Sequence, residues 1–597
     1  MRSLVTTSHI KISGEEIVFL GEWCKKYNQK DSWGDKKYTT IPYHWEDRKK
    51  FNLDHDYLSK FYEELLTNLC VKLNEIHNVE YTKKYWRIII GPWLLVYVPV
   101  LFDRWENINE ACALEENLLT AIPDNKVVRS IARDYSNSLE LMGYDDDWNY
   151  LLYCDILLFK KNHNIKFFRE NFNPSARANT KTSLVSIKNL IVLFAHKVDA
   201  LLNKIWFKRS YKFVLYKTYM PLKFMVKIAL RQFQLPRLFG EFEVSVDYST
   251  EVWSNLRKYH WPNLDSDFEN FAYQQVLQDI PKAYLENYLT IKNMLKRNNF
   301  PVNPEIIMTA NAHYHNEIFK IWMAEMVRNG SKLVVNAHGG AMRAKRCVFF
   351  HEEKICDHKV TWCVPYHNKH VQLSPTKVVK KNNYPGKGNN VTIIGNEFPR
   401  YNCRISSAPM SSLILEDFYQ KVEFIKLLNA FKLPKFSLKI RPYPDRGWSL
   451  KDRYIDIFGI KIVSTQKTLQ DDFLDSKLNI CTYPETTFFE SMQSGIPTVL
   501  LYVEKYWELE ENFIPLARRL VRAKIAHTNS ESAAMHIKNI HTDPQKWWNK
   551  DETKEARLMF DQICGVPSED VSIDKEFHEF LMNISNKKIG GCHSKSV

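Results

Sequence analysis

No apolar run in this sequence is long enough to cross a lipid bilayer. The longest is "IIIGPWLLVYVPVLF", Ile88–Phe102, which is shorter than the roughly 18 residues that a spanning helix needs and contains Pro92 and Pro99. The N-terminal stretch "MRSLVTTSHIKISGEE" also has no apolar core of the kind that a signal peptide requires. We therefore expect the long apolar run to be buried inside a folded domain and the protein to be cytoplasmic.

Cysteine is sparse and irregularly spaced. The chain has 11 cysteines in 597 residues with no repeated interval, which argues against a disulfide framework and fits reduced thiols. One stretch, "CVFFHEEKICDHKVTWC", gathers five possible zinc ligands, namely Cys347, His351, Cys356, His358 and Cys363. Their spacings match no familiar zinc module, and "KVTWCV" alternates like a strand with an inward-facing Cys. We expect no metal and no cofactor, with zinc as the alternative.

Acidic residues are almost missing from one long segment of a chain whose net charge is +14. Residues 181–240 contain twelve Lys or Arg and a single acid, Asp199, interleaved with Leu, Ile, Phe and Trp. A basic, amphipathic segment favours an anionic membrane surface, at about 1 kcal/mol per Lys or Arg near acidic lipid, or another polyanion. A solvated helical face explains the composition equally well. No nucleic-acid recognition module is visible, so we expect no nucleic acid partner.

The length and composition are those of a large globular protein. At 597 residues the chain is too long for one ordinary core, so we expect two to four domains or one large two-lobed enzyme. Its 16 Trp, 30 Tyr and 34 Phe suit deep clefts, although a large, well-filled core explains them too.

The first part of the chain predicts an α/β lobe with an insertion. An apolar run at 15–23 indicates an early strand, and 305–340 has the pattern of a strand, a helix and a second strand that ends in a glycine turn. These patterns place a first lobe at 1–373, with a mostly helical, basic insertion at about 109–299. A stretch rich in Lys, Asn, Pro and Gly at 374–390 predicts a linker.

Beyond the linker, strand and helix patterns alternate again over 391–545, and 546–597 is expected to be helical with a frayed end. Alternation at this length predicts a parallel, doubly wound sheet, so the fold class is α/β with two Rossmann-like lobes.

The turn "TYPETTFFE" lies where a doubly wound sheet binds ligands, between a strand and the helix that follows it. Thr486 and Thr487 would open the helix and offer hydroxyls and backbone N–H groups to a phosphate. Glu490, about one turn further on, could accept hydrogen bonds from a ribose diol. An ordinary capping box explains the same pattern without a ligand.

Two further strand ends carry polar residues. "KIRPYPDRGW" puts Arg441 at the end of a strand, where it could clamp a phosphate, and Tyr443 in the loop that follows. "NAHGGAMRAKR" ends the strand of the first lobe with His338, a possible proton donor or phosphate ligand. Gly339 and Gly340 permit close backbone approach, and Arg343 adds positive charge.

Near the N-terminus, Trp, Arg and carboxylate residues cluster in three short motifs, "FLGEWC", "PYHWEDRKK" and "YWRIIIGPW". Sugar-binding clefts use aromatic faces beside polar groups, although a core Trp near a surface salt bridge explains each motif separately. The candidates for acceptor or sugar binding are Trp23, His44, Trp45, Arg87 and Trp93, and the candidate catalytic carboxylates are Glu22 and Asp47.

Taken in order, these motifs resemble those of a bacterial transferase family found in O-antigen and surface-polysaccharide gene clusters. The matching stretches are "VFLGEWC", "PYHWEDRKK", "YWRIIIGPWL", "FDRW", "NAHGG", "RPYPDRGW" and "TYPETTFFESMQSGIPTVLLY", and the resemblance as a whole spans most of the chain, from about Leu4 to Gly565. The resemblance implies a GT-B-like architecture and a relation to transferases that use CMP-activated nonulosonic acids. Two turns depart from the family pattern: "NAHGG" stands where Gln-His-Gly-Gly is usual, and "YPETT" where a turn of the Tyr-Asn-Ser-Thr-Thr type is usual. Glu485 thereby adds a negative charge beside the expected phosphate.

The resemblance implies a metal-independent glycosyltransferase whose second lobe binds a nucleotide sugar and whose first lobe binds a glycan or lipid-linked acceptor. Arg441, the helix start at Thr486 and His338 would meet the charge of the leaving group. Glu22 or Asp47 would supply the base of an inverting reaction or the nucleophile of a retaining one. Two alternatives stay open, a polyol phosphotransferase with a CDP donor and a non-catalytic scaffold of a polysaccharide complex.

Overall fold

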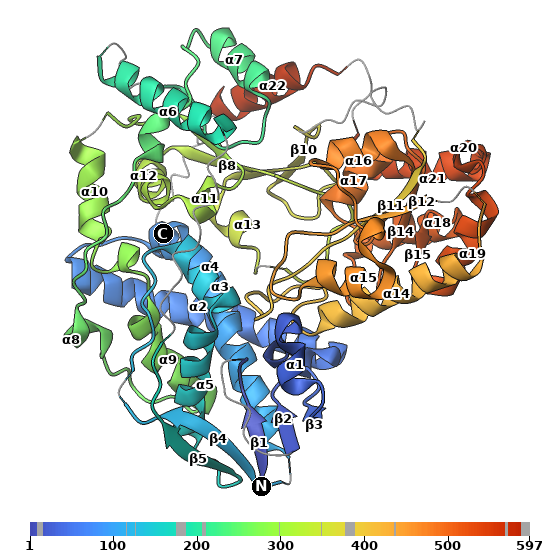
Figure 1. Cartoon of the computed structure of the whole chain (residues 1–597). Coiled ribbons are helices and arrows are strands. Elements are labelled where there is room, and N and C mark those ends of the chain that lie inside the picture. The colour runs from blue at the N-terminus through green and yellow to red at the C-terminus, as the bar shows by residue number, and fades with distance from the viewer. Residues whose placement is uncertain are drawn as a thin grey trace, which may run out of the picture.

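The computed structural model describes residues 1–8, 16–114, 116–125, 127–174, 187–205, 211–297, 299–347, 349–376, 388–434, 437–566 and 571–586. Within these residues the chain forms three five-stranded sheets, and all strand pairs in them are parallel. In Figure 1 the first sheet lies at the bottom, the middle sheet above it and the third sheet on the right.

The first sheet has the strand order β3-β2-β1-β4-β5. Its strands are β1 (Arg2–Val5), β2 (Glu16–Phe19), β3 (Lys37–Thr40), β4 (Leu118–Pro123) and β5 (Ile165–Glu170). Its helices are α1 (Lys30–Trp33), α2 (Arg48–His77), α3 (Lys83–Cys112), α4 (Tyr135–Tyr144) and α5 (Asp146–Lys160). β1 lies at the centre, between β2 and β4, and its apolar residues Leu4 and Val5 are buried.

Helix α3 forms the centre of the core. It carries the long apolar run, including Pro92 and Pro99, and packs against α2, α5 and α12. Among the described residues, α3 is the one helix long and apolar enough to span a membrane, so the expectation that no stretch reaches that length is wrong: the helix continues through Pro92 and Pro99 and beyond both ends of the apolar run. Its whole apolar window is buried inside the protein. The prediction that this run is buried is confirmed.

The middle sheet has the order β10-β9-β8-β7-β6. Its strands are β6 (Phe213–Leu215), β7 (Ile306–Thr309), β8 (Lys332–Asn336), β9 (His358–Thr361) and β10 (His370–Gln372). The helices that lie between β5 and β10 along the chain are α6 (Ile187–Ile205), α7 (Leu222–Arg231), α8 (Ser254–Arg257), α9 (Asp267–Asp279), α10 (Tyr288–Arg297), α11 (Ala312–His315), α12 (Glu317–Arg328) and α13 (His351–Ile355), of which α9 packs on α3. The strand–helix–strand unit predicted at 305–340 is confirmed as β7, α12 and β8.

The third sheet has the order β12-β11-β13-β14-β15. Its strands are β11 (Asn390–Ile394), β12 (Ser437–Arg441), β13 (Ser476–Cys481), β14 (Thr498–Leu501) and β15 (Ala526–His527). Its helices are α14 (Leu413–Ala430), α15 (Leu450–Phe458), α16 (Leu469–Asp475), α17 (Thr486–Gln493), α18 (Ile514–Arg522), α19 (Ser530–Ile540), α20 (Pro544–Trp548) and α21 (Asp551–Ile563).

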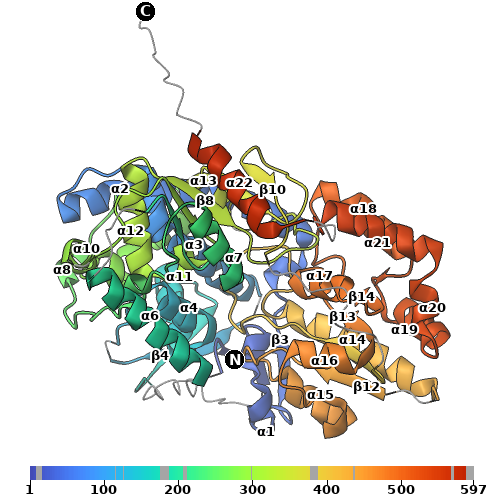
Figure 2. The same cartoon turned by 90° about the horizontal axis from the view of Figure 1, so that it is seen from above.

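The last described helix, α22 (Ile573–Asn586), leaves the third sheet and returns to the middle one (Figures 1 and 2). Its buried Phe577 and Leu581 join a separate apolar cluster with Ile306, Met308 and Val334 of the middle sheet. Helix α22 therefore completes an apolar core whose other members come mainly from the middle sheet and α7, which precede the third sheet in the sequence.

The predicted α/β class with parallel sheets is confirmed, but the chain builds three sheets where the sequence patterns indicated two. The region expected as a mostly helical insertion, 109–299, contains β4, β5 and β6 as well as helices. Of the expected linker, residues 377–387 lie outside the described part of the chain, and its last residue, Asn390, already begins β11. Residues 587–597, for which fraying was expected, are not described either.

Candidate active site

The turn that follows β8 meets the start of α17. A Cβ atom built on Gly339 would lie 2.2 Å from Oγ1 of Thr486, well inside contact distance, so a glycine without a Cβ is needed at this approach. A Cβ on Gly340 would lie 3.4 Å from the buried ring of Trp362. The His-Gly-Gly turn and the Thr-Thr helix start, which the sequence assigned to separate lobes, therefore form one site.

Backbone hydrogen bonds fix the two sides of this site to each other. The N–H of Met342 donates to the carbonyl of Pro484 at 3.1 Å, and the N–H of Lys345 donates to the carbonyl of Glu508 at 2.7 Å. In the opposite direction the N–H of Glu510 donates to the carbonyl of Arg343 at 3.0 Å. The segment after the His-Gly-Gly turn thus pairs with the segment after β14 and holds the middle and third sheets together.

The N-terminus of α17 has no side-chain cap. Glu485 occupies the N-cap position, and its carboxylate makes no capping hydrogen bond. The capping-box alternative is therefore not what the structure contains. The first N–H groups of α17, together with the hydroxyls of Thr486 and Thr487, form a site that favours an anion by geometry and by the helix dipole.

Residues after β6, β7 and β8 come together at the carboxyl edge of the middle sheet. The rings of Tyr219 and His338 lie 6.0 Å apart, and Nδ2 of Asn311 donates to the hydroxyl of Tyr219 at 2.9 Å. His338 is exposed, yet loss of hydration lowers the pKa of its imidazole. His315, also exposed, has its pKa lowered to about 4 by the same effect. Neighbouring protein atoms therefore disfavour the charged form of both imidazoles, although each side chain is exposed.

Glu485, at the start of α17, is a second exposed group whose pKa is shifted by loss of hydration. Its side chain is exposed, but loss of hydration raises the pKa of its carboxyl group, and the guanidinium of Arg404 opposes this rise. Arg404 is exposed and lies over the ring of Phe398, 5.3 Å from its centre. Among the described residues, no carboxylate lies within ion-pair distance of Arg404. Its charge is therefore available to a ligand.

An aromatic row leads from Arg404 to the helix start. Phe398 packs on Trp507, and Trp507 stacks on Tyr483 at 6.3 Å. The hydroxyl of Tyr483 hydrogen-bonds to that of Thr487. Burial raises the pKa of Tyr483, and Tyr443, which is 38% exposed, adds to this rise as a neighbour. The loops after β11, β12, β13 and β14 thus converge here.

Two predicted nucleotide-binding residues lie away from this group. Arg441 ends β12, but β11 separates that strand from β13, so the two strand ends are not neighbours as the sequence suggested. The guanidinium of Arg441 pairs with the buried Asp472 and donates to the carbonyl of Gln466 at 3.3 Å. Glu490 is only 4% exposed, on a buried face of α17.

The three tryptophans proposed for sugar binding are core residues. Trp23, Trp45 and Trp93 are 1%, 0% and 0% exposed, because their rings pack inside the first part of the chain. Nε1 of Trp23 donates to the carbonyl of Thr6 and Nε1 of Trp45 donates to Asp54. A sugar ring cannot reach these faces, so their assignment to the acceptor site is wrong.

The remaining N-terminal candidates have structural partners as well. Arg87 is 6% exposed and makes two hydrogen bonds to Glu63, at 2.8 and 2.6 Å. Glu22 pairs with Lys25 at 2.8 Å. Asp47 caps α2 by accepting from the N–H groups of Lys49 and Lys50. None of these contacts involves His338 or Thr486.

Arg343 stays close to the site but is not free. Its guanidinium stacks on the ring of Tyr366 at 3.9 Å and donates to Sγ of Cys347 at 2.8 Å.

Among the described residues, no group of three or more His, Cys, Asp or Glu side chains could hold a metal ion, so the five possible zinc ligands at 347–363 are not brought together.

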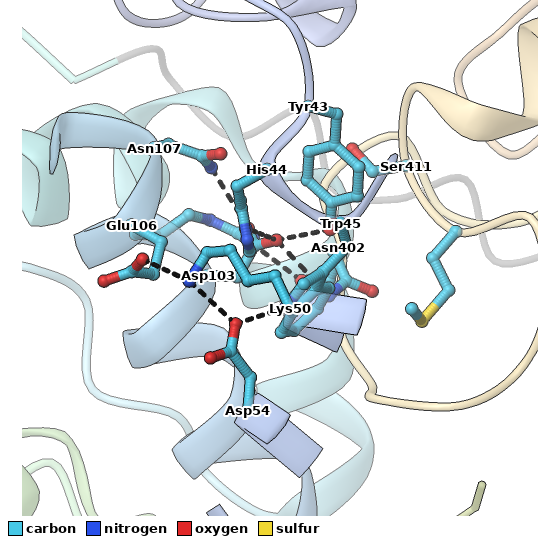
Figure 3. A network of polar contacts seen from close by, with 12 residues as sticks. Tyr43, His44, Trp45, Lys50, Asp54, Asp103, Glu106, Asn107, Asn402 and Ser411 are labelled. Atoms are coloured by element: carbon cyan, nitrogen blue, oxygen red, sulfur yellow. Dashed lines mark hydrogen bonds and ion pairs between the residues drawn. The ribbon is translucent and has the colours of Figure 1, made fainter. Parts of the chain in front are cut away.

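A buried polar network, shown in Figure 3, anchors the loop that carries Arg404. Asp103 on α3 accepts from the hydroxyl of Tyr43, from Nδ2 of Asn107 at 3.2 Å and from Arg104. His44, predicted to bind the acceptor, lies in this network, 3.3 Å from Asp103.

The network reaches the third sheet through Asn402. Arg104 donates to the carbonyl of Asn402 at 2.9 Å. Nearby, Arg400 pairs with Asp146 at 2.7 Å and donates to the carbonyl of Trp23 at 2.6 Å. Because Asn402 and Arg404 are two residues apart, these contacts hold the loop that carries Arg404 in position. No sequence motif indicated these contacts.

The comparisons with known proteins agree with a transferase. The profile of the LIC12162 family of transferases matches residues 2–564, which confirms the family resemblance inferred from the motifs. No curated protein is significantly similar in sequence.

Three solved structures are distantly similar to the chain. A Staphylococcus aureus MnaA–UDP complex matches at 10% identity and a TM-score of 0.35 over 63% of this chain and 98% of its own. The pneumococcal O-GlcNAc transferase GtfA with UDP and GlcNAc matches at 12% identity and a TM-score of 0.30, over 51% of this chain and 61% of its own. The spinosyn rhamnosyltransferase SpnG with spinosyn aglycone matches at 10% identity and a TM-score of 0.28, over 82% of this chain and 97% of its own. At these scores the likenesses carry no functional argument.

Proposed function

We propose that this chain, which belongs to the LIC12162 family of transferases, is a glycosyltransferase that uses a nucleotide sugar. The observation that carries the proposal is the contact between Gly339 and Thr486. It puts an uncapped helix N-terminus, which suits a phosphate, directly against the turn that carries the imidazole of His338. A nucleotide phosphate and the bond to be broken would then lie between the middle and third sheets.

The donor phosphate would bind at the start of α17. The hydroxyls of Thr486 and Thr487 and the first N–H groups of the helix would donate to its oxygens. Arg404, which has no carboxylate partner among the described residues, would supply a full positive charge. Tyr443, exposed and close to Tyr483, would border the nucleoside.

In the transfer step, the bond between the anomeric carbon and the phosphate oxygen breaks while an acceptor hydroxyl bonds to that carbon. The departing phosphate gains negative charge, which the helix N-terminus and Arg404 would stabilise. The acceptor hydroxyl loses a proton. His338, whose lowered pKa keeps the imidazole neutral at neutral pH, would accept it.

The finer assignment is a CMP-activated nonulosonic acid donor in surface-polysaccharide or O-antigen synthesis, with a glycan or lipid-linked acceptor. Such a sugar carries its own carboxylate. Arg404 suits this group better than Arg343 does, because Arg343 already stacks on Tyr366 and contacts Cys347. We propose that the reaction needs no metal or other cofactor.

A thermal-shift series with CMP, CDP, UDP and GDP tests the donor assignment, since a ligand at about 100 times its Kd stabilises the folded state by about 2.7 kcal/mol. CMP should give the largest shift. The double variant T486V/T487V should lose the shift, whereas T542V, at an exposed threonine elsewhere, should keep it. A preference for UDP or GDP overturns the donor, and a phosphodiester product in place of a glycosidic one overturns the reaction class.

A further inference from the structure

Helices α6 and α7 form a surface, here the α6–α7 face, that exposes large apolar side chains to solvent. Phe194 on α6 is 69% exposed, and Phe233, just beyond α7, is fully exposed. Ile191, Leu201 and Leu230 are each more than half exposed as well. The two helices lie on the same side of the molecule (Figures 1 and 2), and a concentration of exposed large apolar side chains on one side is typical of an interaction site.

The exposed residues of α7 follow a helical stripe. The exposed Leu222 and Leu230 and the half-buried Val226 between them recur every four residues, which puts them on one side of the helix. Lys223 and Lys227 form a parallel stripe next to it. α22 packs against α7, where its Asp574 contacts Arg231 at 2.6 Å. In Figures 1 and 2, α6, α7 and α22 together form one side of the molecule.

The one acid of the basic segment faces inward. Asp199 on α6 accepts from the N–H groups of Gly240 at 2.9 Å and Leu238 at 3.2 Å, and from Nε of Arg237 at 2.9 Å. The short helix η4 (Gly240–Glu243) approaches so closely that a Cβ on Gly240 would lie 1.8 Å from the carbonyl oxygen of His196. α6 is therefore attached through the side that carries its only negative charge.

The solvent-facing sides of α6 and α7 carry lysines whose charges are not neutralised by described carboxylates. Lys197, Lys204 and Lys223 are exposed and have no acidic partner among the described residues. Positive charges beside exposed apolar side chains complement a surface with negative headgroups above hydrocarbon, and neither feature alone would favour that surface as well. The other segments of the basic stretch, 181–186 and 206–210, lie outside the described part of the chain.

A cavity of about 230 Å³ lies beneath α7. Its walls are mostly apolar and include Phe213 of β6, Met225 of α7 and Phe239, with Gln234 and Arg237 as polar members. Leu222 and Leu235 line the cavity and are also more than half exposed on the α6–α7 face. The cavity is therefore reached from that face, and its chemistry fits a hydrocarbon chain.

We propose that the α6–α7 face docks on an anionic membrane. Lys197, Lys204 and Lys223 contact the negative headgroups, the apolar residues of α6 and α7 enter the hydrocarbon boundary, and the cavity admits part of a lipid chain. This inference concerns attachment to the membrane and does not depend on which reaction the enzyme performs.

Vesicle flotation of the full-length chain tests the proposal. The protein should float with vesicles that contain phosphatidylglycerol and remain behind with phosphatidylcholine alone, and high salt should weaken the binding. K197E/K204E/K223E should reduce binding to the anionic vesicles about tenfold or more. L222S/L230S/F233S should also reduce it, and F233S alone, at a fully exposed site, covers the case in which the triple variant fails to fold.

Matched controls change the same residue types elsewhere. K426E/K451E/K546E makes the same charge change at exposed lysines of α14, α15 and α20, and L53S/V71S/L558S removes exposed apolar residues from other helices. Both control variants should bind like the unmodified chain. Equal binding of test and control variants, or no flotation of the unmodified chain with anionic vesicles, overturns the proposal.

Discussion

The backbone N–H of Met342 donates a hydrogen bond to the carbonyl of Pro484, so the turn after β8 is attached directly to the turn before α17. Main-chain atoms of the two sheets set the distance across the candidate site, and exchanging side chains does not remove this bond. These backbone hydrogen bonds hold the two sides of the site together, which reduces the ordering cost of binding a nucleotide between them.

Gly339→Ala should block the site. The new methyl group would lie 2.2 Å from Oγ1 of Thr486, and forcing extra volume into such a contact costs about 1 to 3 kcal/mol. We expect a lower unfolding midpoint in urea and loss of the nucleotide-induced thermal shift. The conservative comparison is Gly340→Ala, whose methyl group would lie 3.4 Å from Trp362 and should cost less.

A second variant separates the steric effect from the chemical one. In G339A/T486A the clashing Oγ1 is gone, and the added Cβ would lie 3.4 Å from the Cβ that remains at 486. Stability should return close to that of the unmodified chain, while nucleotide binding should stay weak because the hydroxyl is missing. Full recovery of nucleotide binding would show that Thr486 does not contact the phosphate.

His338 should set the acidic limb of the pH–rate profile. Loss of hydration lowers the pKa of its imidazole, so the neutral form needed to accept a proton persists below the usual value of about 6.5. kcat/KM should therefore fall only when the pH drops through that lowered pKa. His338→Gln, which keeps hydrogen bonding but cannot take the proton, should lose about 10²-fold or more in rate and this limb. An unchanged profile would remove His338 from the mechanism.

Arg404 and Arg441 should have opposite phenotypes. Arg404→Ala should weaken nucleotide binding with little effect on the free energy of unfolding, since no ion pair with a described carboxylate is lost. Arg441→Ala removes the ion-pair partner of the buried Asp472, which keeps its hydrogen bond from Ser464; this should destabilise the chain by about 1 to 3 kcal/mol and spare nucleotide binding. Urea unfolding measures the stability of both variants, and nucleotide titration measures their affinity. If Arg441→Ala weakens nucleotide binding and Arg404→Ala does not, Arg441 belongs to the binding site and Arg404 does not.

Glu485 should make nucleotide binding depend on pH. Its raised pKa means that the carboxyl group protonates at a higher pH than an ordinary Glu. Affinity for the nucleotide should rise as the pH falls through that value, because the charge repelling the phosphate disappears. Glu485→Gln should bind more tightly by about 1 kcal/mol at neutral pH and lose this dependence in a calorimetric titration. Weaker binding by Glu485→Gln would instead indicate that the carboxylate accepts a hydrogen bond from the ligand.

Asp103 should stabilise the loop that carries Arg404. Asp103→Asn leaves the buried Arg104 without its ion-pair partner, which should cost about 3 to 5 kcal/mol. The pKa of Asp103 is lowered in the folded state, with Arg104 as the nearest attractive charge opposing the effect of burial. The ionised Asp103 therefore stabilises the folded state fully above pH about 3.8, and this stabilisation is lost as the pH falls through the lowered pKa. Urea midpoints at several pH values test both statements, and a variant as stable as the unmodified chain contradicts them.

Local patterns predicted most strands of the third sheet and the β7–α12–β8 unit of the middle sheet, but they missed β6 and most of the first sheet. β7, α12 and β8 follow each other within one short segment, so their apolar periodicity is visible in the sequence. β1 is only four residues long, and its neighbour β4 begins at Leu118, after α2 and α3. Pairing between strands so far apart leaves no local signal, which is why 109–299 looked like an insertion.

The same limit applied to the site. Thr486 and His338 follow strands, and that position was enough to select them. Trp23 and Trp45 were selected because Trp beside carboxylates suits sugar binding, but the same residues fill a core, and only burial separates the two roles. Arg404 follows no motif, and its importance depends on the absence of a carboxylate partner among the described residues.

The return of α22 to the middle sheet has a consequence for synthesis on the ribosome. The strands of the first sheet have all emerged once Glu170 has left the exit tunnel, and that sheet can form early. The apolar face around Ile306, Met308 and Val334 is completed only by Phe577 and Leu581, which are translated after the whole third sheet. Until then the nascent chain exposes this face, so we expect it to depend on a chaperone during that interval, and a truncation before α22 to yield insoluble protein.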